Sequence, residues 1–177
     1  VKEEGGDNHY NCAVVAYYPE LLKDNMDELK EIKFIQPFLH IKEEKELVRE
    51  LKMYIPEEFG KFDKKTLRKA VRAGWDLYYK FQEENRAEAD RIIEKARAEG
   101  KKIMVLAGRP YHIDPEIGHG IDLLAETLGF AVVSEDGISH RTTMPRVAVL
   151  NQWTFHSRMY AAAKYVTSQP DMELVQL

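Results

Sequence analysis

The sequence has a single cysteine, and this scarcity excludes several classes of site. Cys12 is the only thiol among 177 residues, so the chain can form no internal disulfide and holds no complete cysteine metal site. No apolar run approaches the ~20 residues that span a bilayer, and the opening VKEEGGDN has no signal-peptide character. We therefore expect a soluble, cytoplasmic protein with no membrane partner, and we expect the chain to be a piece of a larger one.

Several nucleotide-binding and catalytic motifs are also missing. The sequence contains no GxxxxGK[ST] loop, no GxGxxG turn and no GxSxG elbow, so it gives no support for ATP binding or serine hydrolysis. The formal charge is only −4, and lysine and arginine alternate with glutamate along helical patterns instead of clustering. A nucleic-acid partner is not expected either.

The most informative stretch runs from residue 101 to residue 137. Two short apolar runs, at residues 103–107 and 130–133, flank a helical pattern that Asp114 can cap and that Gly129 can end. A helix between two such runs is typical of parallel strands buried on both faces. The sequence therefore predicts a Rossmann-like α/β fold, with an open, mainly parallel sheet whose middle strand is at residues 103–107.

Three regions are expected along the chain: a partial, smaller α/β unit at residues 1–60, a long linking helix at residues 61–100, and the Rossmann-like domain at residues 101–177. The further elements that we predict are strands at residues 12–17, 32–35, 146–150 and 173–177, and helices at residues 39–54 and 152–167. Asp63 is the expected cap of the linking region, which is either one long helix or two.

Candidate site residues follow the two predicted strands, because ligands of open α/β sheets bind at the carboxyl ends of the strands. The loop GRPYHID carries Arg109 as an anion partner, Tyr111 beside it, and His112 as an acid, base or ligand. With free amides after Asp114, this loop suits a phosphate, a carboxylate or a thioester carbonyl.

The second strand is followed by two carboxylates, Glu135 and Asp136, which can orient a histidine or bind a cation. The alternative is structural: Arg109 pairs with one of these carboxylates, and His112 only packs beside its loop.

Three other residues are weaker candidates. His119 lies between two glycines at the start of the predicted helix, where the glycines cost roughly 1 kcal/mol each and the close approach of a backbone or a ligand is one compensation. Asn151 can cap the helix that follows it, and we include it among the ligand-binding candidates. Cys12 is either a small buried hydrophobe or one ligand of an iron–sulfur cluster whose other thiolates lie elsewhere. His156 is expected to be a boundary residue of the core rather than a ligand.

Four blocks carry a family resemblance: CAVVAYYPELLKDNM, LAGRPYHIDPEIGHGID, GFAVVSEDGIS and NQWTFHSRMYAAAKYV. With them, the chain resembles the 2-hydroxyglutaryl-CoA dehydratase and benzoyl-CoA reductase superfamily, and more narrowly the acyl-CoA dehydratase activase-related proteins. The resemblance implies a dehydratase-like region, ATPase-type activator domains in the intact protein, and a four-iron cluster held by cysteines. Since this chain has only Cys12, we expect it to lack the cluster when isolated.

The leading hypothesis is thus an iron–sulfur-associated, dehydratase-like module of a larger protein. That protein takes part in ATP-driven electron transfer for 2-hydroxyacyl-CoA dehydration or acyl-CoA reduction. Its expected partners are other domains of the same protein and an acyl-CoA dehydratase component. The alternative is a non-catalytic docking module, or a module that binds an anion or a nucleotide.

Overall fold

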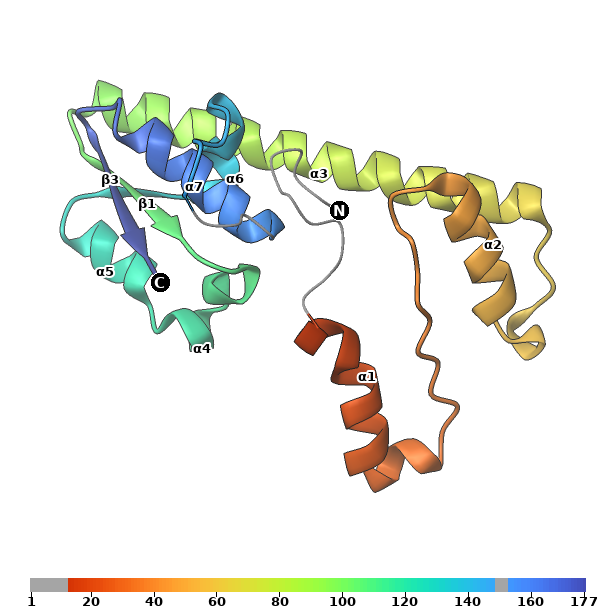
Figure 1. Ribbon diagram of the computed structural model, residues 1–177. Coiled ribbons are helices and arrows are strands. Elements are labelled where there is room, and N and C mark those ends of the chain that lie inside the picture. The colour runs from red at the N-terminus through yellow and green to blue at the C-terminus, as the bar shows by residue number, and fades with distance from the viewer. Residues whose placement is uncertain (1–12, 149–152) are drawn as a thin grey trace. The chain divides into compact units, whose positions relative to one another are not determined.

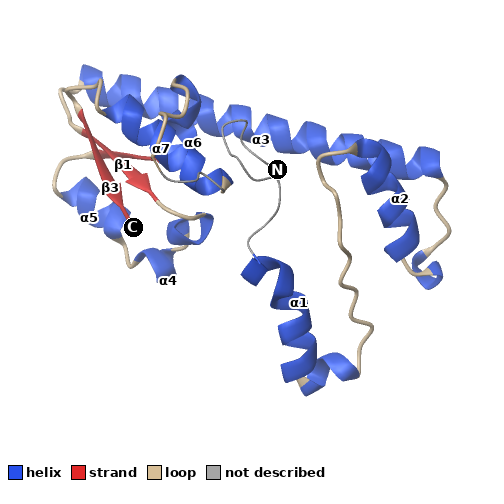
Figure 2. Cartoon of the chain, in the orientation of Figure 1, coloured by secondary structure: helices blue, strands red, loops and turns tan. Residues whose placement is uncertain are grey.

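The computed structural model describes residues 13–148 and 153–177, which form two compact units (Figures 1 and 2). The first unit ends at Tyr79 and the second begins at Lys80, so the boundary falls inside the long helix α3 (Lys64–Ala98). The linking region therefore forms one helix and not two, while the expected domain limits at residues 60 and 100 stay predictions. No helix among the described residues has the length and apolar character needed to cross a bilayer.

The regular elements among the described residues of the first unit are all helices. Its elements before α3 are α1 (Ala13–Asn25), η1 (Asp27–Lys30), α2 (Glu44–Tyr54) and η2 (Glu57–Phe59). The strands predicted at residues 12–17 and 32–35 are wrong: residues 13–17 lie in α1, and residues 32–35 form a bend and a loop that pair with no strand among the described residues. A short apolar run does not distinguish strand from helix by its periodicity, and an extended segment becomes a strand only where a neighbour completes its hydrogen bonds.

The first unit is held together where α2 packs on the start of α3. Leu47 and Val48 of α2 are buried against Leu67 and Val71 of α3, as the amphipathic pattern predicts. The predicted cap of α3 is confirmed, because the backbone N–H of Thr66 donates to Asp63 Oδ1 over 2.7 Å.

The second unit is built on a three-stranded sheet with the order β2-β1-β3, where β1 is Ile103–Ala107, β2 is Ala131–Ser134 and β3 is Met172–Gln176. Both neighbours run parallel to β1, with Val105 opposite Val133 on one side and Leu174 on the other. The α/β fold and the central position of the strand at residues 103–107 are therefore confirmed.

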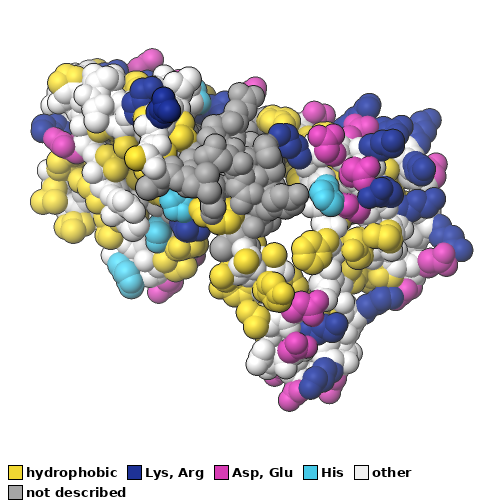
Figure 3. All heavy atoms as spheres, viewed as in Figure 1, with side chains coloured by type: hydrophobic (Ala, Val, Ile, Leu, Met, Phe, Trp, Pro, Cys, Tyr) yellow, Lys and Arg dark blue, Asp and Glu magenta, His cyan; other side chains and the backbone are white. Residues whose placement is uncertain are grey.

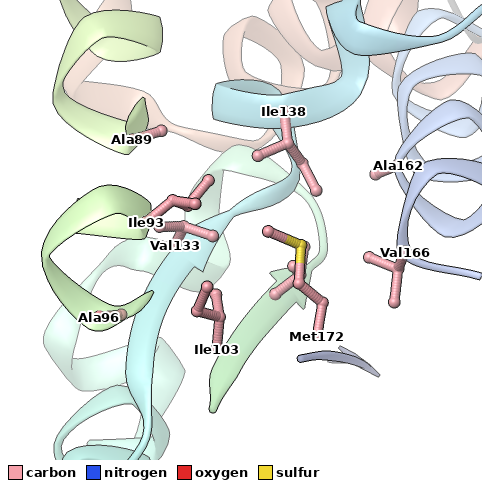
Figure 4. Packing of buried hydrophobic residues seen from close by; sticks show 10 residues of the cluster. Ala89, Ile93, Ala96, Ile103, Val133, Ile138, Ala162, Val166 and Met172 are labelled. Atoms are coloured by element: carbon pink, nitrogen blue, oxygen red, sulfur yellow. The ribbon is translucent and has the colours of Figure 1, made fainter. Parts of the chain in front are cut away.

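One face of this sheet is covered by the end of α3 together with α6 (Glu135–Ile138) and α7 (Thr154–Val166). Figure 4 shows Ile93 of α3, Ile138 of α6 and Val166 of α7 converging on the side chains of the strands. Alternate residues of β1, Ile103 and Val105, point to this face and have no exposed surface. The remaining helices, α4 (Pro115–Gly118) and α5 (Ile121–Thr127), lie on the opposite face (Figure 1).

Two predicted elements of the second unit differ from the structure. The single helix expected after Asp114 is split into α4 and α5, because His119 and Gly120 adopt left-handed conformations with φ of 50° and 70°. The strand predicted at residues 146–150 is wrong for residues 146–148, which form no strand, and residues 149 and 150 lie outside the described residues. The run Arg146–Ala148 has no neighbouring strand to pair with, so β-branched side chains alone do not make it one.

The packing of α6 on α3 gives a stability prediction. A Cβ at Gly137 of α6 would lie 2.6 Å from the Ala89 side chain, so Gly137→Ala should lower the free energy of unfolding by roughly 1–3 kcal/mol through overpacking. Gly74→Ala is the matched control: Gly74 lies inside α3 with nothing within 4 Å of an added Cβ, so this change should stabilise by roughly 1 kcal/mol through helix propensity. Urea unfolding followed by circular dichroism measures both, and stabilisation by Gly137→Ala would contradict the close packing.

Candidate functional site

The sheet opens a crevice at the carboxyl ends of its strands. The chain passes from β1 to β2 by way of α4 and α5 on one face, and returns from β2 to β3 by way of α6 and α7 on the other. The two connections therefore leave the carboxyl ends of β1 and β2 towards opposite faces of the sheet, and open α/β sheets bind ligands where connections diverge in this way. A cavity of about 190 Å³ lies here, and its lining includes Leu106 of β1, Ser134 of β2 and Leu177 just after β3.

Arg109 and His112 line this cavity from the GRPYHID loop, where Pro110–Ile113 forms the single turn η3. The backbone N–H of Arg109 donates to His112 Nδ1 over 3.0 Å, so a neutral His112 ring carries its proton on Nε2. Gly108 is required beneath this ring, because a Cβ there would lie 2.4 Å from Nδ1. The loop thus fixes His112 as a donor through Nε2.

Tyr111 supports His112 from outside the cavity. The two rings meet edge to face with centroids 4.5 Å apart, and the Tyr111 side chain is otherwise exposed. Tyr111 therefore positions the histidine and does not itself line the cavity.

The carboxylates after β2 have partners other than Arg109. Glu135 lines the cavity and accepts from Arg158 Nη2 over 2.8 Å, while Asp136 accepts from the Ser134 hydroxyl over 2.5 Å. Within the described residues the Arg109 guanidinium forms no ion pair, so the structural alternative in which it pairs with Glu135 or Asp136 is not observed. Arg109 is an exposed cation that can accept an anionic ligand.

Glu135 is a carboxylic acid in an unusual setting, because only 5% of its surface is exposed. Burial raises the pKa of Glu135; the charge of Arg158 acts in the opposite direction, and that of Asp136 adds to the rise. Arg158 itself lies over the Phe155 ring, 5.0 Å from its centroid. Sequence reasoning missed Arg158, since only the fold brings α7 to the end of β2.

The amides expected to be free after Asp114 are in use. The Asp114 carboxylate accepts from the N–H groups of Glu116 and Ile117 at 2.9 Å and 3.3 Å, and α4 continues for only one turn. The binding of an anion at this end of the cavity therefore depends on the Arg109 guanidinium and not on the amides of a helix terminus.

The glycines of the GHG segment have a structural reason. A Cβ at Gly118 would lie 2.6 Å from the His112 carbonyl oxygen, so the expected close backbone approach is present at this glycine, while Gly120 has open space around it and a positive φ of 70°. His119 itself is exposed in the left-handed region and is not among the residues that line the cavity.

His156 of α7 belongs to the same end of the sheet. Its ring is half-buried, and Nδ1 has no hydrogen-bond partner among the described residues. Burial lowers the pKa of His156, and the positive charge of Arg109 lowers it further. The block NQWTFHSRMY marked this helix, but nothing in its spacing placed the histidine near Arg109.

Two predicted site residues, Cys12 and Asn151, lie outside the described residues. Residues 13–148 and 153–177 contain no group of three or more histidine, cysteine, aspartate or glutamate side chains that could hold a metal ion. Of the predicted set, the structure brings Arg109, His112 and Glu135 together in one cavity.

The electrostatic link between Arg109 and His156 gives a prediction. Arg109→Ala should raise the pKa of His156 part of the way to its ordinary value, because the repelling charge is lost while the burial remains. Proton NMR titration of the imidazole signals measures this shift. His140 is the internal control, since burial, Arg86 and Arg141 lower its pKa, and its titration should not change. If the His156 titration is unchanged in the Arg109→Ala protein, Arg109 has no electrostatic effect on His156.

Comparison with protein-family models places residues 1–138 in one family, described as CoA enzyme activase uncharacterised domain. No curated protein and no solved structure matches the chain. The match covers well over half of the 177 residues and includes β1, the GRPYHID loop, α4, α5, β2 and α6. The chain therefore belongs to the CoA enzyme activase uncharacterised domain family.

Proposed function

We propose that this chain is a dehydratase-like module of a larger, cytoplasmic activase-related protein, which takes part in ATP-driven electron transfer to 2-hydroxyacyl-CoA dehydration or acyl-CoA reduction. The membership of a CoA enzyme activase family supports the proposal at the level of the protein class. The observation that supports a binding site is the Arg109 guanidinium in the crevice at the strand ends, which forms no ion pair with any residue that the structure describes. The dehydratase-like module would bind its acyl group there.

The size of the cavity limits what can bind. At about 190 Å³ it is smaller than the roughly 300–1,000 Å³ of pockets that enclose drug-sized ligands. It has room for a thioester with a short acyl group or for a phosphate, and the bulk of a coenzyme A molecule would stay outside.

The chemistry of the lining suits such a group. Arg109 would neutralise a carboxylate or polarise a thioester oxygen, and His112 would donate a hydrogen bond through Nε2. Glu135 is the titratable group best suited to exchange a proton there, because its raised pKa lets it hold a proton at a pH where an exposed glutamate has lost its own.

An iron–sulfur cluster does not fit the residues of this chain alone. A cluster needs about four ligands, usually thiolates, and Cys12 is the single cysteine. We therefore assign the chain at most one ligand of a cluster that the rest of the intact protein would complete, and we derive no chemical step from it.

Ligand titration tests the role of Arg109. Isothermal titration with a short-chain 2-hydroxyacyl-CoA should show binding that Arg109→Ala weakens about tenfold to a hundredfold, since a hydrogen bond to a charged group contributes about 1.5–3 kcal/mol. Arg91→Ala should leave the affinity unchanged, because Arg91 pairs with Glu88 on the exposed side of α3. Free coenzyme A and inorganic phosphate are the comparison ligands. If free coenzyme A binds as tightly as the thioester, the cavity does not recognise the acyl group.

Iron analysis tests the role of Cys12. Anaerobically purified full-length protein should contain iron and acid-labile sulfide, and Cys12→Ala should lower both, because the cluster loses one of its thiolates. The present chain by itself should be iron-free. Asn11→Ala is the neighbouring control and should retain the iron of the unaltered protein. Full iron content in the Cys12→Ala protein would remove this residue from the cluster.

A further inference from the structure

The net charge of the protein is concentrated in one short segment. The segment from Pro110 to Phe130 contains four of the 30 acidic residues and none of the 26 lysines and arginines, so the other 26 acidic residues balance all 26 basic ones. The Asp114 carboxylate caps α4, whereas Glu116, Asp122 and Glu126 form no ion pair within the described residues. Asp122 lines the cavity, so the outer layer formed by α4 and α5 is acidic through the exposed carboxylates of Glu116 and Glu126.

The same layer exposes large apolar side chains. Leu123, Leu124 and Leu128 have 62%, 58% and 67% of their surface exposed. Leu124 and Leu128 are one helical turn apart and so lie on one flank of the α5 helix, while Ala125 faces inward with 2% exposed. Figure 3 shows hydrophobic side chains gathered over α4 and α5, at the left of the view.

The layer is also incomplete as a cover for the sheet. Met104, Leu106 and Val175 point to the face opposite the core of Figure 4 and are only partly buried. Parallel sheets normally have both faces covered by helices, and on this face the described residues supply only the short α4 and α5.

We propose that this surface, defined by Ile117, Leu123, Leu124 and Leu128 with the carboxylates of Glu116 and Glu126, docks an amphipathic helix of a partner protein whose apolar stripe is bordered by lysine and arginine. The leucines anchor the apolar stripe, and the unpaired carboxylates attract the basic border. A second copy of this chain is the poorer occupant. A two-fold interface would set this acidic surface against an identical acidic surface, and like charges facing each other oppose association.

A model peptide tests the proposed chemistry. The probe is an amphipathic peptide of leucine and lysine, about 18 residues long, with leucine at helical spacing; a scrambled peptide of the same composition and a leucine–glutamate peptide are its controls. Fluorescence anisotropy with the whole chain should show binding of the first peptide only. Equal binding of the scrambled peptide would reduce the effect to bulk charge and overturn the proposal.

Variants locate the binding site of the peptide. Leu124→Ser with Leu128→Ser should weaken binding by at least about tenfold, because the two buried leucines together contribute more than about 1.4 kcal/mol. Glu126→Gln should weaken it less, and the difference should vanish at high salt. Leu77→Ser with Phe81→Ser is the matched control, since this pair is also exposed and one turn apart, on α3. Equal weakening by both pairs, or by neither, would overturn the proposal.

The oligomeric state distinguishes the remaining occupant. Sedimentation velocity should give the same particle mass in solution for the unaltered chain and for the variant with Leu124→Ser and Leu128→Ser. A dimer of the unaltered chain that these changes dissociate would assign the surface to a second copy. Circular dichroism should show the same helix content in every variant, because all four side chains are exposed.

Discussion

The parallel pairing of β1 with both neighbours is the constraint on which the second unit depends. One face of the central strand is sealed by side chains from α3, α6 and α7, and Ile103 and Val105 lose all contact with water there. A fully buried side chain of this size contributes about 1.5–3 kcal/mol, so the register of the strands and the position of α3 are determined together. Because the sheet is parallel, every connection must cross a face of the sheet, and the loops after the strands collect at one edge.

Close approaches of backbone and side chain then shape that edge. The His112 ring packs on Gly108, and the His112 carbonyl oxygen packs on Gly118. Because neither glycine has a side chain, the GRPYHID loop can lie close to α4. After Gly118 the left-handed residues His119 and Gly120 end α4, and α5 begins as a separate element at Ile121. A loop fixed in this way keeps Arg109 exposed toward the cavity and ties its amide to His112.

The two proposed roles use different surfaces of one unit. The cavity combines Arg109, which has no ion pair within residues 13–148 and 153–177, with a buried acid and a fixed imidazole donor, and this set suits the recognition of a small polar group. The outer layer of α4 and α5 combines acid with exposed leucine, which suits a basic helix. The GRPYHID loop and α4 connect the cavity to the outer layer, so they separate a ligand site from a docking site by a few residues of chain.

The sequence by itself determined the elements whose local signals agree with their surroundings. The apolar runs gave β1 and β2, Asp63 and Asp114 capped α3 and α4 as predicted, and the loops after the strands supplied Arg109, His112 and Glu135 to one cavity. These succeed because apolar periodicity and capping act within a few residues, and because a parallel sheet brings strand ends together whatever the details.

Only the tertiary structure decided the rest. It placed the backbone carbonyl of His112 against Gly118, just before the left-handed residues His119 and Gly120 that separate α4 from α5. It also paired Glu135 with Arg158, and it brought His156 close enough to Arg109 for that charge to lower the pKa of the imidazole. Such pairings join residues more than 20 positions apart, and no local pattern encodes them, since they follow from which faces of the sheet the helices cover.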